Sequence, residues 1–322
     1  MSKKGNKKEP AKFKTRIGGQ ALIEGVMMKG SDTEAMAVRL PDGTIDLETW
    51  SLPAAKWYQK TPFIRGPVNF VTTLIDGYRC ISKSADKSMQ GVEEEEPSKF
   101  EKWLTDKLGD KLMAGLMVVA GVLGVALALL LFVYLPALAT RGLAILIPGL
   151  DDIYILKNII EGALKIGIFV FYIWLTSRLK DIRRTYEYHG AEHKTIACYE
   201  AGDELTVENV KKHIRFHPRC GTSFIFLVLF ISIIVNTLFM LPGDVVWLRA
   251  LLKLCVLPIV VSVAYEVIRI NGRYDNVATR IISAPGLWIQ RLTTREPDDS
   301  QIEVAIAAFM PCVHEDKEKD KW

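Results

Sequence analysis

The hydrophobic positions of this chain gather into four long apolar runs, at residues 112–139, 159–176, 223–241 and 245–267. A helix rises about 1.5 Å per residue, so each run has roughly the length that crosses the ~30 Å hydrocarbon core of a bilayer. The pattern therefore predicts four transmembrane helices, and Pro258 should kink the last of them. The apolar run at 143–150 is too short to span and is expected to be a re-entrant or interfacial piece.

Two charged residues, Glu161 and Lys165, lie near the start of the second run. They are four residues apart, so on a helix they would share one face and could form an ion pair. Both could also lie at the membrane interface, and neither possibility removes the predicted span.

The chain before the first span has the pattern of a small α+β unit outside the membrane. Residues 35–40 and 45–52 alternate between apolar and polar positions around a Pro-Asp-Gly-Thr turn, which predicts a β-hairpin. Apolar residues then recur with a helical period over 68–87. The unit is expected over 17–90, after a basic disordered tail at 1–16 and before an acidic linker and pre-membrane segment at 91–111.

The membrane domain is expected over 112–292, and a C-terminal helix and charged tail follow at 293–322. The apolar stretch at 281–292 suits the membrane interface, where tryptophan is enriched. Asp298 and Asp299 are good capping residues for a helix over 302–309. The predicted fold class is an α-helical integral membrane protein with about four transmembrane helices and a small α+β cytoplasmic N-terminal unit.

The distribution of lysine and arginine predicts how the chain is oriented. The segment 178–221, between the second and third spans, holds nine of them, whereas the loop between the first two spans holds Arg141 and Lys157. Because basic residues stay on the cytoplasmic side, we expect a multi-pass protein of the cell membrane with both termini and segment 178–221 in the cytoplasm. The net charge of +4 suggests no nucleic-acid partner. The five scattered cysteines form no disulfide framework and fit a reducing compartment.

The strongest chemical signal is the pattern H-x-x-E-H, formed by His189, Glu192 and His193. On a helix the two histidines project from one face and can hold one divalent metal, for which zinc is the expected ion. Glu192 could then take a proton from a water molecule that the metal activates, as in reversed zinc-protease motifs. His217 and Cys220 add another imidazole and a thiol, so they are further metal-ligand candidates.

Three glutamates are additional candidates. Glu200 and Glu266 could supply the downstream carboxylate ligand that such motifs use, although Glu266 could equally snorkel to the interface or pair with Arg269. Glu24 lies within a short apolar run whose glycines allow tight turns or close approach. A buried carboxylate needs a partner, so Glu24 is either paired, a metal or substrate contact, or exposed at a strand end.

Four runs of sequence resemble one family. They are Gly-Gly-Gln-Ala-Leu-Ile-Glu-Gly-Val-Met-Met at 18–28, Tyr-His-Gly-Ala-Glu-His-Lys at 188–194, His-Pro-Arg-Cys-Gly-Thr-Ser-Phe at 217–224 and Thr-Thr-Arg-Glu-Pro-Asp-Asp at 293–299. Together they resemble the DUF1385, or YqhQ-like, bacterial membrane proteins over nearly the whole chain after Lys14. The resemblance implies a predicted metal-dependent enzyme, but that description rests on the same histidine and glutamate motif and brings no substrate.

Three functions compete. In a membrane-embedded metal-dependent hydrolase, His189, His193 and one of His217 or Cys220 hold the metal, and the substrate is a lipid-linked molecule or a membrane-proximal peptide. In a structural site all four ligands close a tetrahedron, and the protein is a scaffold, an assembly factor or a lipid transporter. Without a metal, the histidines are ordinary residues of a cytoplasmic loop, and the protein binds partners through its N-terminal unit.

Overall fold

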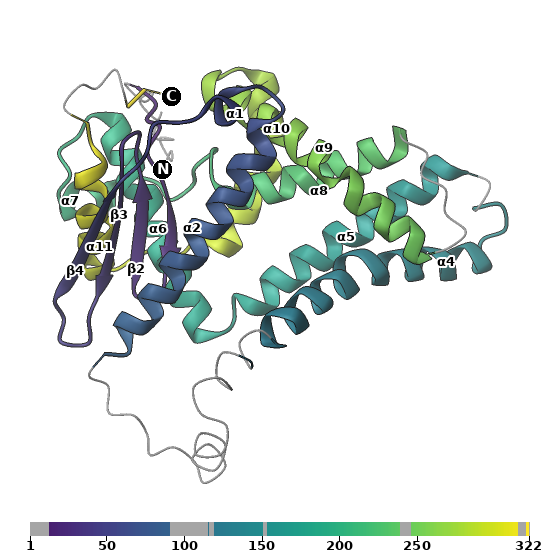
Figure 1. Cartoon of the computed structure of the whole chain (residues 1–322), viewed down its shortest axis with the longest axis horizontal. Helices are drawn as coiled ribbons and strands as arrows, with labels where there is room; N and C mark the ends of the chain where they lie inside the picture. Colours follow the sequence, from purple (N-terminus) through teal and green to yellow (C-terminus); the bar gives the residue numbers. More distant parts are fainter. Residues whose placement is uncertain are drawn as a thin grey trace, which may run out of the picture. The chain divides into compact units, whose positions relative to one another are not determined.

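A computed structural model describes residues 13–90, 115, 119–150, 153–238, 246–314 and 320–321 (Figure 1). The chain divides into two compact units. One unit joins residues 1–90 to 172–228 and 259–322, and the other consists of 91–171 and 229–258. The first unit thus groups the histidine segment, which was expected in the membrane domain, with the N-terminal strands and the C-terminal helix.

A four-stranded antiparallel sheet forms the centre of the first unit, with strand order β1-β2-β3-β4. The strands are β1 (Gly18–Leu22), β2 (Gly25–Lys29), β3 (Thr33–Arg39) and β4 (Ile45–Ser51). The predicted hairpin at 35–40 and 45–52 is confirmed as β3 and β4, in register from Thr33 opposite Ser51 to Arg39 opposite Ile45. The glycine-rich run before it forms a second hairpin that the alternation did not predict.

Both faces of the sheet are covered, so β2 and β3 are almost completely buried. Side chains alternate between the faces along a strand. Met27, Met36 and Val38 pack with Cys80 of α2 (Arg65–Ser88) on one face. Val26, Met28, Ala35 and Ala37 pack on the other face against α6 (Lys180–Ala201) and α11 (Asp299–Phe309).

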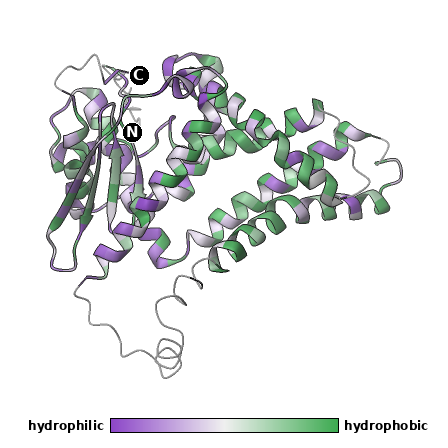
Figure 2. Ribbon diagram, in the orientation of Figure 1, coloured by the Kyte–Doolittle hydropathy of each residue, from purple (hydrophilic) through white to green (hydrophobic). Residues whose placement is uncertain are grey.

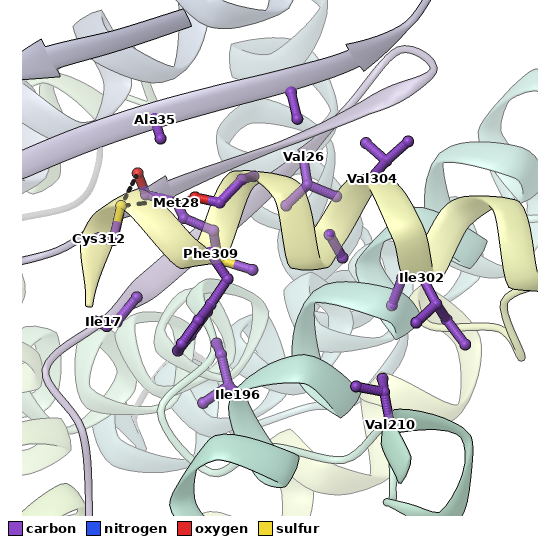
Figure 3. Packing of buried hydrophobic residues seen from close by; sticks show 14 of the residues in the cluster. Ile17, Val26, Met28, Ala35, Ile196, Val210, Ile302, Val304, Phe309 and Cys312 are labelled. Atoms are coloured by element: carbon purple, nitrogen blue, oxygen red, sulfur yellow. Dashed lines mark hydrogen bonds between the residues drawn. The ribbon is translucent and has the colours of Figure 1, made fainter. Parts of the chain in front are cut away.

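The hydrophobic core between the sheet and helices α6 and α11 joins residues that are far apart in the sequence (Figure 3). Phe309 of α11 packs with Ile196 of α6 and with Ile17 before β1. Of the two predicted capping residues, Asp298 is the N-cap, because its side chain accepts the backbone N–H of Gln301, whereas Asp299 is already the first residue of α11, which begins before the predicted 302. Residues 13–16, expected within a disordered tail, are ordered: Thr15 bridges to Lys321 and donates its N–H to Glu200 Oε1 at 2.7 Å.

The segment expected to be a loop at 178–221 is largely helical. It contains α6 and α7 (Val207–Lys212), and it ends where α8 (Gly221–Leu238) begins. Helix α10 (Val277–Thr293) covers the stretch expected to lie at the interface and keeps Pro285 inside it. The short helix α1 (Trp57–Lys60) precedes α2, and the 3₁₀ turn η2 (Met310–Cys312) follows α11.

Among the described residues, four helices are long and apolar enough to cross a membrane: Val119–Leu146, Tyr154–Thr176, Gly221–Leu238 and Leu251–Arg273. Figure 2 colours most of their residues green, which marks hydrophobic side chains. The first contains the π-helical turn η1 (Leu130–Tyr134) and α4 (Leu135–Leu146), the second is α5, and the last lies within α9 (Val246–Arg273). The chain is therefore compatible with a multi-pass membrane protein, as expected.

Several helix bounds differ from those of the predicted spans, since the second helix begins at Tyr154 rather than 159 and the third at Gly221 rather than 223. The helix of the first predicted span, expected at 112–139, continues to Leu146, so the start of the predicted re-entrant piece at 143–150 is the end of this helix. The expected beginning at 112 lies outside the described residues. The fourth helix extends past 267 to Arg273, because hydropathy falls at its charged end while the helix continues.

Polar contacts join the apolar helices within the second unit. Lys165 Nζ lies 3.1 Å from Glu161 Oε1 on α5, which confirms the predicted pair. Lys253 of α9 contacts the same carboxylate. Gly162 allows α8 to approach, because a Cβ there would lie 2.3 Å from Ile233 Cγ1.

Candidate metal centre

Helix α6 brings the two histidines of the motif together, as the sequence predicts. The imidazole centroids of His189 and His193 are 4.4 Å apart. The second half of α6 is buried on nearly every side, although its composition is polar. The helix ends at Gly202, whose φ of +76° is the left-handed cap conformation that glycine adopts without strain.

Both imidazoles are oriented by backbone carbonyl groups. His189 donates its Nδ1–H to the Thr293 carbonyl oxygen at 2.8 Å, and His193 donates its Nδ1–H to that of Arg215 at 2.6 Å. A carbonyl oxygen can only accept, so these bonds hold a proton on Nδ1 of each ring and leave Nε2 as the atom that binds a metal once it carries no proton. Carbonyl groups behind histidine ligands are a recurrent feature of metal sites.

The third member of the cluster is Cys220, whose Sγ lies 3.2 Å from His189 Nε2. Ligand atoms of His189, His193 and Cys220 all lie within 4.8 Å of one another, the one such group found among the described residues. His193 Nε2 is buried and has no hydrogen-bond partner in the described part of the chain. Zinc commonly binds imidazole nitrogen and cysteine sulfur atoms, so these three residues are suitable ligands for a divalent metal.

The charges in the cluster favour a thiolate. Burial raises the pKa of the Cys220 thiol, but the neighbouring imidazoles outweigh it and hold that pKa well below its ordinary value. Burial lowers the pKa of His189, but Cys220, Glu192 and the hydrogen bond to the Thr293 carbonyl group together raise it to about 9, so in the metal-free cluster His189 is the imidazolium partner of the Cys220 thiolate. Burial and the Arg219 guanidinium together hold the pKa of His217 well below its ordinary value. Cys220 is thus in the form that binds metals, and His217 is neutral.

Glu192 lies against the same cluster. Burial raises the pKa of its carboxyl, and the imidazoles of His193 and His189 oppose that effect. Its side chain is 4% exposed, and Oε2 has no hydrogen-bond partner among the residues that the structure describes. Strand β1 covers the carboxyl closely, since a Cβ on Gly19 would lie 3.1 Å from Glu192 Cδ. A buried carboxyl with a free acceptor beside a ligand cluster is suited to hold a proton.

His217 lies next to the cluster but does not join it. Its ring centroid is 5.4 Å from that of His193, and its Nε2 accepts a bond from Arg219 Nη2 at 3.1 Å. Gln290 of α10 holds the His217 backbone by accepting its N–H at 2.8 Å and donating to its carbonyl oxygen at 2.7 Å. Gln290 carried no signal in the sequence, because its role depends on α10 packing beside residue 217.

The three additional glutamates all bind arginines. Glu200 pairs with Arg219, and Glu266 accepts from Arg65 Nε at 2.8 Å. Neither joins the ligand group, so the structure provides no carboxylate as a third ligand within the described residues. Glu24, at the β1–β2 turn with φ of +51°, binds Arg184 of α6 and accepts from Tyr188 at 3.1 Å.

Gly190, inside the H-x-x-E-H motif, allows another segment to cross α6. A Cβ at this position would lie 1.9 Å from the Arg295 carbonyl oxygen. Arg295 also donates its N–H to the Tyr186 carbonyl oxygen at 2.8 Å. The run at 293–297, which carries no ligand signal in the sequence, is thereby fixed on α6, where it supplies the carbonyl group that orients His189.

The described residues thus define a mostly helical fold with four candidate spans and a largely buried His/His/Cys cluster. The model of the family described as "Protein of unknown function (DUF1385)" matches residues 61–315. The chain is also 33% identical to the "Uncharacterized protein YqhQ" of Bacillus subtilis (strain 168) over 296 residues, which are 91% of this chain and 90% of that protein. The chain therefore belongs to the DUF1385 family. No solved structure matches it.

Proposed function

We propose that this protein is a membrane-embedded, metal-dependent enzyme of the hydrolase type. His189, His193 and Cys220 would hold a divalent metal, for which zinc suits the donor set best. The supporting observation is the convergence of three ligand atoms within 4.8 Å, with the Nδ1 atom of each imidazole bound to a carbonyl oxygen. When bound, such a metal supplies Lewis-acid activation of water or of a carbonyl group.

The number of ligands favours catalysis over a structural role. Catalytic zinc sites have three protein ligands and one open position, whereas structural sites have four. Glu192 is the proposed general base. Its buried carboxyl has a raised pKa and an oxygen without a hydrogen-bond partner in the described residues, and both properties suit a group that accepts and passes on a proton.

The proposed substrate is a lipid-linked molecule or a membrane-proximal peptide. Helix α6 follows the candidate span Tyr154–Thr176 after three residues, and Cys220 directly precedes the span that begins at Gly221. The ligands are therefore close along the chain to two span ends. The basic residues of 178–221 favour the cytoplasmic side for this segment and for both termini.

A structural metal site is the second candidate, and the position of His217 supports it. Its ring neighbours that of His193, so a rotation that breaks its bond to Arg219 would make it a fourth ligand. The closed site would stabilise the unit as a scaffold, an assembly factor or a lipid transporter.

Cobalt substitution distinguishes the two candidates without a substrate. In the three-ligand site, His217→Ala retains cobalt, and added azide changes the visible cobalt spectrum because it takes the open position. In the closed site, His217→Ala loses cobalt and azide has no effect on the wild-type spectrum. Glu192→Gln should retain the metal in both cases, so its loss of any activity found later would identify the base rather than a ligand.

A further inference from the structure

The second helix, α2, has the inverse of the usual amphipathic arrangement. Its buried residues are small or weakly polar: Gly66, Gly77, Cys80 and Ser84. Its outer stripe, consisting of Val71, Leu74, Ile75 and Tyr78, is more than half exposed at every position. An amphipathic helix of a soluble domain places its apolar stripe on the core. Here the periodicity that predicts the helix belongs to the face turned away from the protein.

Close contacts on the inner face fix this orientation. A Cβ on Gly77 would lie 2.3 Å from Gln20 Oε1, and one on Gly66 would lie 3.0 Å from Ser262 Cα. Arg79 also donates to the buried Glu34 of β3 at 2.8 Å. Rotating α2 to bury its outer stripe would bring bulky side chains against these atoms, so the exposure is a feature of the fold.

The beginning of α2 is attached to α9, which contains a candidate membrane span. Arg65 pairs with Glu266, and Asn69 Nδ2 donates to the Tyr265 hydroxyl at 3.0 Å. The contact of Gly66 with Ser262 is on the same face of α9. The beginning of α2 is therefore fixed on a helix that is apolar enough to lie in lipid.

The turn before α2 presents apolar and basic side chains together. Phe63 is exposed and has φ of +65°, a conformation that side-chain-bearing residues rarely adopt. Two hydrogen bonds hold Phe63 in this conformation: Ser262 Oγ donates to the Phe63 carbonyl oxygen at 2.6 Å, and Glu266 accepts the Phe63 N–H at 3.2 Å. Lys60 is exposed just before this turn, as is Trp57.

We propose that residues 56–81 form an in-plane anchor that lies on the bilayer surface, with the outer stripe of α2 inserted among the lipids. The occupant of this face is lipid, because the beginning of α2 is attached to a helix that contains a candidate span and because exposed aromatic and basic residues precede the stripe. Apolar side chains enter the boundary of the acyl chains, while lysines attract anionic headgroups. The anchor holds the sheet of the first unit against the membrane independently of any metal.

Photocrosslinking in the full-length protein tests this proposal. Benzoylphenylalanine replaces Leu74, and the protein is irradiated in nanodiscs that contain phosphatidylglycerol and phosphatidylethanolamine. Phe171, an exposed residue of a candidate span, is the positive control, and Asp42, in the exposed turn between β3 and β4, is the aqueous control. Intact-mass spectrometry should find one phospholipid added at Leu74 as efficiently as at Phe171, and at least tenfold less at Asp42.

Two sets of results would overturn the anchor. One is a Leu74 probe that gains lipid no better than the Asp42 probe while the Phe171 probe reacts. The other is a cross-link from Leu74 to a second copy, to another protein or to another segment of this chain, because a different occupant would then cover the stripe. Unchanged melting midpoints verify that all three labelled chains fold, and exposed positions tolerate the substitution.

Discussion

Gly190→Ala is the single change that best tests how the motif helix is packed. The new Cβ would lie 1.9 Å from the Arg295 carbonyl oxygen, so that segment would have to move by roughly 1.5 Å to reach ordinary contact distance. The movement would strain the Arg295 bond to the Tyr186 carbonyl oxygen. It would also shift the Thr293 carbonyl group, which accepts from His189 Nδ1.

The expected loss follows from these contacts. Overpacking costs about 1–3 kcal/mol, and a weakened backbone hydrogen bond costs about 1 kcal/mol. The better helix propensity of alanine returns about 1 kcal/mol. A net loss of about 2 kcal/mol should lower the melting midpoint by roughly 4–8 °C. Because His189 loses its orienting carbonyl group, zinc affinity should fall by about 10–100-fold.

Thermal unfolding in mild detergent, followed by tryptophan fluorescence, and zinc titration of the chelator-treated protein measure the two effects. Gly167→Ala is the matched control, since a Cβ added at that helical glycine would meet nothing within 4 Å. It should keep or slightly raise the midpoint and leave zinc affinity unchanged. A Gly190→Ala protein with wild-type midpoint and affinity would refute the packing at this crossing.

Three further experiments test contacts around the metal-ligand candidates. Gly19→Ala should lower zinc affinity and stability, because its Cβ would lie 2.5 Å from a β2 carbonyl oxygen and crowd the motif carboxyl. Iodoacetamide at pH 7 should alkylate Cys220 in the metal-free protein far faster than Cys312. Burial raises the pKa of the Cys312 thiol to about 12, whereas the pKa of the Cys220 thiol is depressed. Bound zinc should protect Cys220 from the reagent. Glu24→Ala and Arg184→Ala should each destabilise by about 1 kcal/mol or less, and non-additively, as partners of one partly exposed pair.

Peptide mass spectrometry checks the alkylation, and equal reaction of both thiols, or no protection by zinc, would contradict it. The alkylation rate of Cys220 should fall as the pH is lowered toward its depressed pKa, because the thiolate is then protonated. A double-mutant cycle of melting midpoints checks the ion pair, and strictly additive effects would show that the two side chains do not interact.

The sequence predicts the local arrangement of the motif but not its environment. The spacing of His189 and His193 places them on one helix face, because residues four apart always share a face. The carbonyl groups that orient them belong to Arg215 and Thr293, which come near only through tertiary packing. Similarly, Glu266 could be named as a possible ligand, but its pairing with Arg65, 201 positions away, carries no local signal.

Periodicity also identifies an element without giving its neighbours. The apolar spacing over 68–87 predicts α2, and the structure confirms the helix, yet the spacing cannot indicate whether its apolar face is turned inward. The alternation at 35–40 and 45–52 predicts a hairpin. The second face of that sheet is covered by α6 and α11, which begin at Lys180 and Asp299, and no short pattern can predict contacts over such separations.

Zinc content per chain tests the central claim most directly. Protein purified in mild detergent, or loaded with zinc and then desalted, should contain about one zinc ion. His193→Ala and Cys220→Ala should lose it, whereas His213→Ala should retain it, because His213 instead pairs with Asp203 on the exposed side of the unit. A wild-type chain that binds no zinc even after loading, or a Cys220→Ala chain that binds it as tightly as wild type, would contradict the proposed centre.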